Sequence, residues 1–195
     1  LTIRKGFIMP YLTGDRIMLR EYRMTDLPHI REWVNDPEIT DNLSDIFLYP
    51  QTVENTEQFV NSMIQGSPNH KGFVIADKVT QDYIGQIDLV DIDWKNRTAS
   101  LGIVIGKKPY LGQGYGSEAI RLLQELAFHS LNLHRLELMV YEFNERALRC
   151  YRKCGFREEG RLRQKLYRKG RYWDVIWMGI LREEYEQMRA ENGQS

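Results

Sequence analysis

Short segments in which apolar and polar residues alternate recur along this chain of 195 residues. Alternation with a period of two is typical of a strand that buries one face. It predicts strands at residues 16–22, 72–76, 83–89, 98–105, 135–141, 156–167 and 172–180. Clusters of Gly, Asn, Asp and Lys predict turns near residues 78–82, 93–97 and 168–171.

Other segments repeat their apolar residues every three or four positions, which predicts amphipathic helices. We expect helices at residues 25–35, 52–65 and 117–131, a short helix after Asn144, and a polar helix at 182–190. Asp36-Pro37 ends the first of these helices. Residues 40–50 follow neither period and are interpreted as a loop.

The order of these elements predicts the fold class. Two helices come early, a meander of strands follows, and then come a strand, a helix, a strand, a helix and a final hairpin. This order predicts an α+β (mixed α/β) fold with one central, mainly antiparallel sheet. The length suits a single domain at residues 15–185, with an extension at 1–14 that we expect to be disordered and a tail at 186–195.

Three glycines at alternate positions, Gly112, Gly114 and Gly116, join the strand at 98–105 to the next helix. Glycine lets the backbone approach a ligand closely, and a helix N-terminus presents unpaired N–H groups to an anion. The loop is therefore a candidate phosphate site, with a plain tight turn as the alternative. It has neither the Lys-Ser or Lys-Thr of a Walker loop nor the G-x-G-x-x-G spacing of a dinucleotide oxidoreductase.

Two segments resemble a known family. Leu111-Gly112-Gln113-Gly114-Tyr115-Gly116 resembles the Arg/Gln-x-x-Gly-x-Gly/Ala motif of the GCN5-related N-acetyltransferases (GNAT). Residues 144–156, from Asn144 through Tyr151 to Phe156, resemble the second motif of that family. The one departure is Leu111, which stands where the family usually has Arg or Gln and so removes a polar side chain from the loop.

The resemblance implies a twisted sheet in which two neighbouring parallel strands, here 98–105 and 135–141, splay apart to form a cleft. It implies that acetyl-CoA is the cofactor and CoA the product of direct acetyl transfer to a primary amine. The cofactor residues carried over are Ile103, Val104, Ile105, Leu111, Gly112, Gln113, Gly114, Tyr115, Gly116, Ser117, Asn144, Ala147 and Tyr151.

Tyr151 matches the family tyrosine that protonates the departing thiolate, which makes it the candidate general acid. Its spacing from Ala147 and Leu148 places it on the apolar face of its helix, so a core tyrosine is the alternative. Asn144 matches the family residue that binds the pantetheine arm, and it is equally suited to cap the helix that follows. Those two roles of Asn144 are compatible.

The general base is less well defined by the sequence. Many relatives carry a Glu on the strand where this chain has Ser100, so no carboxylate can be carried over directly. Asp88 is the preferred candidate, because its neighbours in the same strand would face the opposite side. Asp91, Asp93 and a chain of water molecules are alternatives, and Asp88 could also be a surface carboxylate.

Charge is distributed unevenly although the net charge is zero, and zero net charge argues against a nucleic-acid partner. Residues 32–70 contain acidic side chains but no Lys or Arg, whereas residues 141–172 are strongly basic. The basic part suits an anionic cofactor. The acidic part suits a cationic acceptor, with Asp36, Glu38 and Asp41 as candidate substrate residues and a solvated surface as the alternative.

Over residues 15–185 the chain resembles the branch that holds spermidine acetyltransferases and ribosomal-protein N-terminal acetyltransferases. A polyamine or another small amine is therefore the preferred acceptor. The first alternative is a protein N-terminus. The second is a module that binds acyl-CoA without catalysis, for which Leu111 and Ser100 argue.

The remaining expectations concern location and assembly. Cys150 and Cys154 lie one helical turn apart, which suits neither a zinc site nor a disulfide, and the four histidines are scattered, so we expect no metal. No apolar run is long enough to span a membrane and no secretion signal is recognised, so we expect a cytoplasmic protein without a membrane partner. Tyr172, Trp173 and Trp177 either belong to the core or pair with a second copy in a homodimer or larger homo-oligomer.

Overall fold

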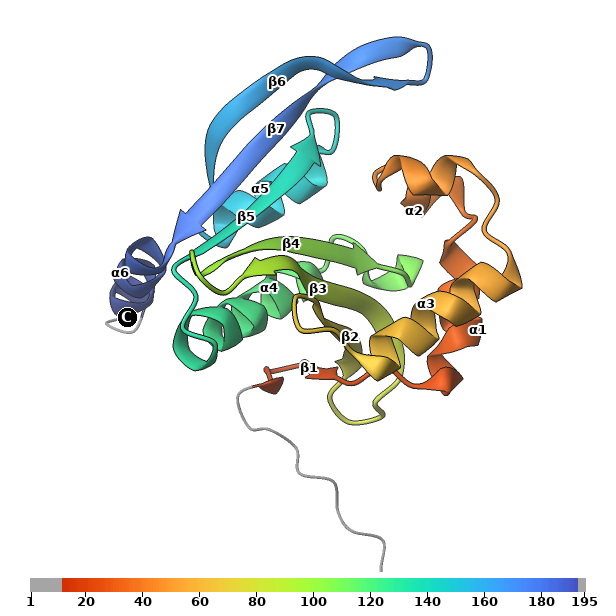
Figure 1. Ribbon diagram of the computed structural model, residues 1–195, viewed down its shortest axis with the longest axis horizontal. Coiled ribbons are helices and arrows are strands. Elements are labelled where there is room, and N and C mark those ends of the chain that lie inside the picture. Colours follow the sequence, from red (N-terminus) through yellow and green to blue (C-terminus); the bar gives the residue numbers. More distant parts are fainter. Residues whose placement is uncertain (1–11, 193–195) are drawn as a thin grey trace, which may run out of the picture.

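The computed structural model describes residues 12–192 (Figure 1). Its centre is one seven-stranded sheet within those residues, with the spatial order β1-β2-β3-β4-β5-β7-β6. The strands are β1 (Ile17–Arg20), β2 (Lys71–Asp77), β3 (Tyr83–Asp93), β4 (Thr98–Ile105), β5 (Arg135–Tyr141), β6 (Arg157–Arg168) and β7 (Arg171–Leu181). All neighbouring strands are antiparallel except β4 and β5, so the predicted fold class is confirmed.

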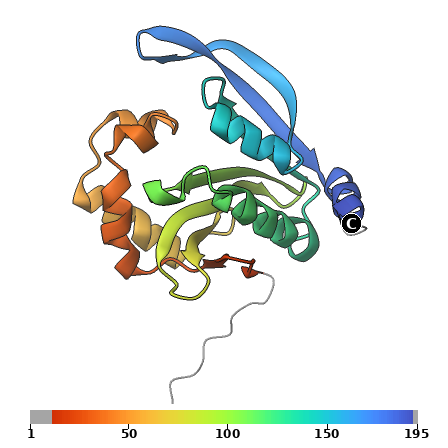
Figure 2. The ribbon, with the colours of Figure 1, turned by 180° about the vertical axis from the view of Figure 1, so that it is seen from behind.

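Helices cover both faces of the sheet. They are α1 (Leu27–Trp33), α2 (Pro37–Thr40), α3 (Val53–Gln65), α4 (Tyr115–Glu125), α5 (Glu145–Lys153) and α6 (Arg182–Asn192). Short turns of helix are η2 (Met24–Asp26), η3 (Asp45–Leu48), η4 (Lys108–Tyr110) and the π-helical η5 (Leu126–Ser130). Helices α1 and α3 lie on one face, and α4 and α5 lie in front of the sheet when it is seen from behind (Figure 2).

The sheet divides between β4 and β5. Their parallel pairing runs only from Thr98, opposite Arg135, to Ser100, opposite Glu137. Beyond Ser100, β4 stays paired with β3 as far as Ile105, while β5 stays paired with β7 as far as Tyr141. The predicted splay of these two strands is therefore confirmed. It leaves the edge of β4 that faces β5 unpaired beyond Ser100, toward Ile105.

The alternation of side chains along β3 and β4 separates two hydrophobic clusters. Ile87 and Leu89 of β3 pack with α4, α5 and η5 in the larger cluster. Tyr83 and Val74 pack with α1 and α3 in the smaller one. The two faces of the sheet therefore have separate cores, and Ile87 and Leu89, two positions apart in β3, belong to the same face.

Most predicted elements are present, with shifts of a few residues at their ends. The loop predicted at residues 40–50 is in part wrong, because α2 and η3 fall within or beside it. Asp36 caps α2 by accepting a hydrogen bond from the Glu38 N–H at 3.0 Å, and Pro37 occupies its first position. A single helical turn is too short to produce a recognisable period in the sequence.

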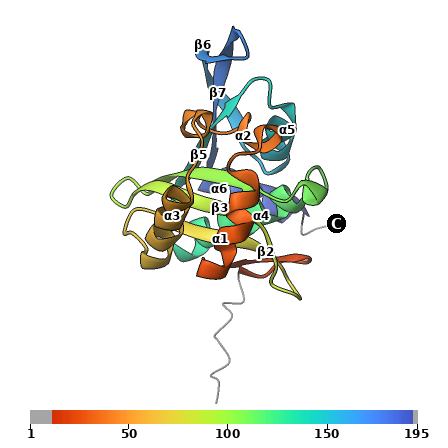
Figure 3. The ribbon, with the colours of Figure 1, turned by 90° about the vertical axis from the view of Figure 1, so that its right-hand side faces the viewer.

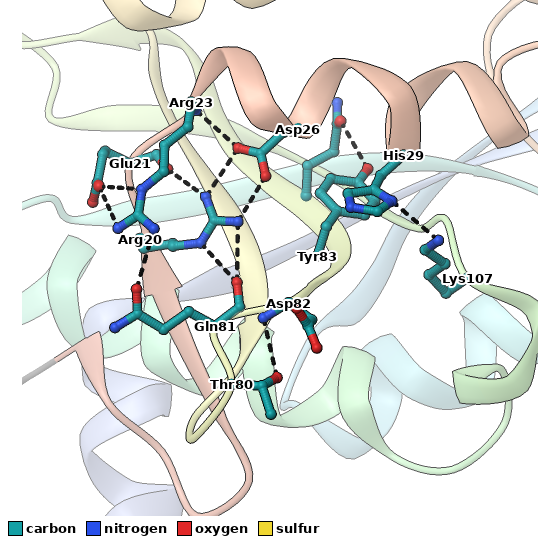
Figure 4. A network of polar contacts seen from close by, with 11 residues as sticks. Arg20, Glu21, Arg23, Asp26, His29, Thr80, Gln81, Asp82, Tyr83 and Lys107 are labelled. Carbon is teal, nitrogen blue, oxygen red and sulfur yellow. Dashed lines mark hydrogen bonds and ion pairs between the residues drawn. The ribbon is translucent and has the colours of Figure 1, made fainter.

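A buried ion pair fastens the start of α1 to the sheet. Arg20, which is 5% exposed, donates two hydrogen bonds to Asp26 at 2.7 and 2.9 Å and two more to the Gln81 carbonyl (Figure 4). A guanidinium that is fully paired in this way orients the groups around it. The network thereby sets the position of α1 against the turn between β2 and β3.

Parts of both predicted terminal segments belong to the described residues. Residues 1–11 of the predicted extension and 193–195 of the predicted tail lie outside the described residues. Leu12 is buried in the larger cluster, and α6 continues through the predicted boundary at residue 186 and buries Tyr185. Within residues 12–192 no helix is long and apolar enough to cross a membrane.

The hairpin of β6 and β7 extends away from the rest of the molecule (Figure 3). At its tip Tyr167 and Tyr172 stack edge to face, and both are about 60% exposed. Arg168 returns from the hairpin to the other half of the molecule, where it bonds the Asp41 and Leu43 carbonyls and the Asp45 carboxylate. The hairpin thus ties the two halves of the split sheet together.

Candidate active site

The predicted phosphate loop adopts a conformation that requires glycine. Gly112 and Gly114 have φ values of 75° and 88°, in the region that side-chain-bearing residues rarely occupy. Gly114 is the N-cap of α4, which begins at Tyr115. The N–H groups of the first turn have no carbonyl partner within the helix, so they are available to an anion beside the loop.

A second set of contacts fixes this loop against β1. Arg16 pairs with Glu118 at 2.9 Å and donates to the Gln113 carbonyl at 3.0 Å. Its guanidinium lies 4.2 Å from the centre of the Tyr115 ring, which also packs edge to face on Tyr110 at 4.9 Å. Tyr115 therefore packs between the residues on either side of the loop and supports it.

A cavity of about 560 Å³ lies between the loop, the free edge of β4 and α5. Of the predicted cofactor residues, those that line it are Ile103, Val104, Ile105, Leu111, Gly112, Gln113, Gly114, Gly116, Ser117, Asn144, Ala147 and Tyr151. Tyr115 is the one predicted cofactor residue that the lining does not include, and Asp88 also lies outside it. The structure thus brings two motifs that are thirty residues apart to one site.

Helix α5 carries the candidate acid. Asn144 caps the helix by accepting a hydrogen bond from the Ala147 N–H at 3.2 Å, so its capping role is confirmed. Tyr151, which is 8% exposed, packs on Phe156 and lines the cavity. Burial raises the pKa of Tyr151 well above its usual value, and the sulfurs of Cys150 and Cys154 raise it further. The hydroxyl therefore stays protonated at neutral pH and can donate a proton.

Three basic side chains on α5 complete one wall of the cavity. Arg146, Arg149 and Lys153 are spaced at i, i+3 and i+7, so they form one stripe that lines the cavity together with Tyr151. The basic composition of this segment is visible in the sequence, but composition alone does not place these three residues at the site. Their helical spacing after Asn144 was a signal that could have identified them. On the opposite side Ile39, Asn42 and Leu43 line the cavity.

Two thiols join α4 to α5 beside the cavity. Cys150 Sγ lies 3.3 Å from Ser117 Oγ, and Cys154 donates to the Ser117 carbonyl at 3.6 Å. Both cysteines are free. The hydrogen bond with Cys154 and that with Ser117 lower the pKa of Cys150 to about 6, against the opposing effect of burial.

Asp88 lies on the other face of the sheet, with the α1 and α3 core. Its carboxylate accepts a hydrogen bond from Tyr22 at 3.3 Å and lies 3.9 Å from His70 Nε2. Burial raises the pKa of Asp88 above its ordinary value, while His70 and Tyr22 lower it in part. The Asp88 carboxylate in turn raises the pKa of His70.

Glycines flank Asp88 in both neighbouring strands. Gly72 pairs with it from β2, where an added Cβ would lie only 2.4 Å from the Asp88 carboxylate. Gly102 pairs with it from β4, where an added Cβ would meet nothing within 4 Å. The space over Gly102 is therefore open. Because β4 and β5 separate just beyond Ser100, Asp88 is level with the point where the sheet begins to split.

The predicted substrate carboxylates all have cationic partners within the chain. Lys108 pairs with both Asp36 and Glu38, at 2.7 and 2.8 Å. Lys169, at the hairpin tip, pairs with Asp41 at 2.5 Å. These ion pairs tie α2 to η4 on one side and to the hairpin on the other.

With this geometry established, comparison with known proteins places the chain. The family model described as the acetyltransferase (GNAT) domain matches residues 16–157. The chain belongs to the GNAT family. It is an acyltransferase enzyme, and acetyl-CoA is the cofactor that this family uses.

Individual relatives agree with the resemblance seen in the two motifs. Spermidine N(1)-acetyltransferase of Vibrio cholerae is 31% identical over 173 residues, which are 88% of this chain and 96% of the relative. A crystal structure of that organism's spermidine N-acetyltransferase with CoA and spermine has a TM-score of 0.78 at 28% identity, and covers 89% of this chain and 99% of that one. A putative ribosomal N-acetyltransferase of Bacillus subtilis is 34% identical over 102 residues, or 52% of this chain and 55% of the relative.

Because GNAT enzymes use acetyl-CoA, the cavity is the candidate site for this cofactor. The resemblance to the spermidine and ribosomal branch is confirmed, as is the GNAT fold with its splayed strands. Within residues 12–192 the structure contains no group of three or more His, Cys, Asp or Glu side chains arranged to hold a metal ion.

Proposed function

We propose that this GNAT enzyme transfers the acetyl group of acetyl-CoA directly to the primary amine of a small molecule. The observation that carries the proposal is the cavity at the split of the sheet. It combines a glycine loop at a helix N-terminus, an unpaired strand edge and a buried tyrosine. Each of these features suits one part of acetyl-CoA.

The cofactor is proposed to lie along the cavity from the loop to the split. The backbone N–H groups of residues 112–117 bind the pyrophosphate, and the basic stripe of α5 faces its charge. Beyond Ser100, β4 is not paired with β5, so the backbone groups on that edge of β4 are available to the pantetheine arm and the thioester carbonyl. Hydrogen bonds to that carbonyl stabilise the oxyanion that forms as the amine attacks.

The proposed reaction has balanced proton transfers. The acceptor arrives as an ammonium ion and gives one proton to Asp88, with His70 beside it. The freed amine attacks the thioester carbonyl, so a C–N bond forms and the C–S bond breaks. Tyr151 protonates the departing thiolate to give CoA. The second proton of the amine returns through solvent to Tyr151, and Asp88 releases the proton that it took from the ammonium ion to solvent, which restores the enzyme for the next turnover.

A polyamine is the first candidate acceptor, because the relatives named above include spermidine acetyltransferases that match nearly the whole chain. The candidate substrate residues Asp36, Glu38 and Asp41 remain part of this proposal. For them to bind a polyamine, its ammonium groups must replace Lys108 and Lys169.

The ion pairs of Lys108 and Lys169 also favour the second candidate acceptor, a peptide N-terminus. Once neutralised, the acidic segment no longer gives a polycation an advantage over a peptide. If the protein only bound acyl-CoA, replacing Tyr151 would leave its function unchanged, since a binding module has no thiolate to protonate.

An assay of thiol release with acetyl-CoA tests the proposal. The acceptors are spermidine, spermine, small monoamines and peptides with Ser, Ala or Thr at the N-terminus, and mass spectrometry identifies the acetylated product. Turnover of small amines supports the proposal, and turnover of peptides alone moves the enzyme to the second candidate. Tight binding of acetyl-CoA without turnover of any acceptor contradicts both.

We further propose a cytoplasmic location and a homo-oligomer. Both cysteines are free thiols, as is usual in a reducing compartment. The exposed pair Tyr167 and Tyr172 at the hairpin tip is the surface proposed to meet a second copy. Light scattering on the protein and on Tyr172→Ser checks this, because the variant is then expected to have the lower mass.

A further inference from the structure

A second cavity, of about 890 Å³, lies on the other face of the sheet. It is enclosed by α1, η3, α3 and strand β3. Aromatic and aliphatic side chains make up much of its wall, and the residues that matter below are Trp33, Phe47, Tyr49, Phe59, Ser62 and Gln86. No sequence pattern indicates this cavity, because its lining comes from four separate segments.

Two buried polar side chains line this cavity, Thr56 at 4% exposure and Gln86 at 7%. The Thr56 hydroxyl is already bonded to Arg31 and to the Thr52 carbonyl, which leaves Gln86 as the polar group to consider. Trp33 donates a hydrogen bond to the Tyr83 hydroxyl at 3.0 Å, and that hydroxyl donates to Gln86 Oε1 at 3.3 Å. His29 stacks on the same Tyr83 ring and holds it in place (Figure 4). This chain of donors fixes the orientation of the Gln86 amide.

The amide nitrogen of Gln86 has no hydrogen-bond partner among residues 12–192. Gln86 lines the cavity and its amide nitrogen keeps access to solvent, so a ligand oxygen that accepts its hydrogen bond can take the place of water there. Because the Tyr83 hydroxyl uses the amide oxygen, the group left for a ligand is a donor. It suits a carbonyl, carboxylate or hydroxyl oxygen, and it does not suit an ammonium group, which can only donate.

The second cavity borders the reaction centre. Gln86 pairs across the strands with Val104, which lines the cofactor cavity. Asp88 lies two residues further along β3 and therefore faces the same side as Gln86. An amine held over Gly102 beside Asp88 would consequently have the rest of its molecule next to Gln86 and the aromatic wall.

We propose that this cavity binds the acceptor, and that the acceptor is a primary amine on an apolar or aromatic body with a hydrogen-bond acceptor for Gln86. This inference rests on the proposed acetyl transfer to a small amine, and within that class it prefers an apolar or aromatic amine to the polyamine considered first. Trp33, Phe47 and Phe59 give the body an apolar surface. The Asp45 carboxylate at the rim is held by Arg168 at 2.5 Å, so it offers a polycation little attraction.

Two matched amines test the inference with acetyl-CoA in the thiol-release assay. Phenylalaninamide carries an aromatic body and a carbonyl, phenethylamine has the same body without the carbonyl, and spermidine is the polycation. We expect Gln86→Leu to raise the KM of phenylalaninamide about tenfold through loss of one buried hydrogen bond. The KM values of phenethylamine and acetyl-CoA should stay unchanged.

Two further variants keep the test independent of folding. Ser62 is an exposed position of α3 at the cavity, so Ser62→Phe should fill the space and raise the KM of both aromatic amines. Gln65→Leu is the matched control, because Gln65 is exposed at the end of the same helix and does not line the cavity. Melting temperatures of all three variants identify any general loss of stability.

The outcomes separate this inference from the proposed function. Acetylation of any of these amines with KM values unchanged in both Gln86→Leu and Ser62→Phe overturns the inference and leaves acetyl transfer standing. Calorimetry with phenylalaninamide measures the cavity without turnover. Binding that Ser62→Phe abolishes, in an enzyme that acetylates no amine, supports the cavity and contradicts the proposed function. Absence of both binding and turnover overturns both.

Discussion

The two faces of the split sheet are built on different principles. On the α4 face the proposed ligand groups are largely backbone atoms, namely the N–H groups of the glycine loop and the edge of β4. On the α1 and α3 face they are side chains, such as Asp88 and Gln86, that come from several segments. We therefore expect a site made from backbone geometry to tolerate a change such as Leu111, and a site made from side chains to determine which acceptor binds.

The largest expected effect tests whether Tyr151 belongs to the chemistry of the cofactor face. We expect Tyr151→Phe to lower kcat by roughly 10²- to 10⁴-fold, since the leaving thiolate loses its acid. The Kd of acetyl-CoA, measured by calorimetry, should stay within about twofold. Unchanged turnover would assign Tyr151 to the core and remove the acid from the mechanism.

The next largest effect concerns Asp88 on the acceptor face. We expect Asp88→Asn to lower kcat/KM by about 10²-fold at neutral pH, because the ammonium ion then has no base. Burial raises the pKa of Asp88, so the activity of the unmodified enzyme should rise with pH as Asp88 loses its proton, at a pH above the range of an ordinary aspartate. This rise forms the acidic limb of the pH profile. In the variant that limb should vanish, leaving a profile that follows only the ionisation of the amine. The same limb in both proteins would exclude Asp88 as the base.

A smaller effect is expected at the glycine loop. Gly114 has a φ of 88°, where a β-branched residue is strained by on the order of 1–3 kcal/mol. Gly114→Val should therefore displace the loop and raise the KM of acetyl-CoA about tenfold or more. Gly160, where an added Cβ meets nothing within 4 Å, provides the control substitution Gly160→Val. Equal KM values in both variants would contradict a role for the loop backbone.

Chemical modification sharpens the boundary of the cofactor cavity. Because its hydrogen bonds with Cys154 and Ser117 lower the pKa of Cys150, its thiolate is more populated at pH 7 than that of an ordinary cysteine, and reactivity should fall as the pH drops. We expect iodoacetamide to alkylate Cys150 about tenfold faster than a free thiol at pH 7 and acetyl-CoA to protect it. Mass spectrometry of the modified peptide, with Cys150→Ser as control, measures both. A rate that acetyl-CoA leaves unchanged would place the thiol outside the occupied cavity.

The smallest effect is expected on the basic wall of α5. Arg149→Ala should raise the Kd of acetyl-CoA by about threefold at low salt, and the difference should shrink as ionic strength rises. Arg163, an exposed arginine on β6 outside the cavity, is the control. A difference that does not depend on salt would mean that Arg149 acts by packing rather than by charge.

The sequence was informative where all the residues of a motif lie in one short segment. The glycines at 112 and 114 require positive φ, and Asn144 to Tyr151 spans a single helix, so both could be assigned before the structure was known. Asp36, Glu38 and Asp41 show the opposite case. Their partners Lys108 and Lys169 lie far away in the chain, so composition showed the acidic run and concealed its neutralisation. No sequence pattern identifies Gln86, because its proposed role depends on its contact with Tyr83 and on the cavity around it.

The most direct test of this division between faces is a paired measurement of Michaelis constants in Gly114→Val and Gln86→Leu. The account predicts that Gly114→Val raises the KM of acetyl-CoA and leaves that of phenylalaninamide unchanged. Gln86→Leu is expected to raise the KM of phenylalaninamide and to leave that of acetyl-CoA unchanged. A change in the same constant in both variants, or a KM of acetyl-CoA that responds only to Gln86→Leu, would contradict the assignment of cofactor and acceptor to opposite faces of the sheet.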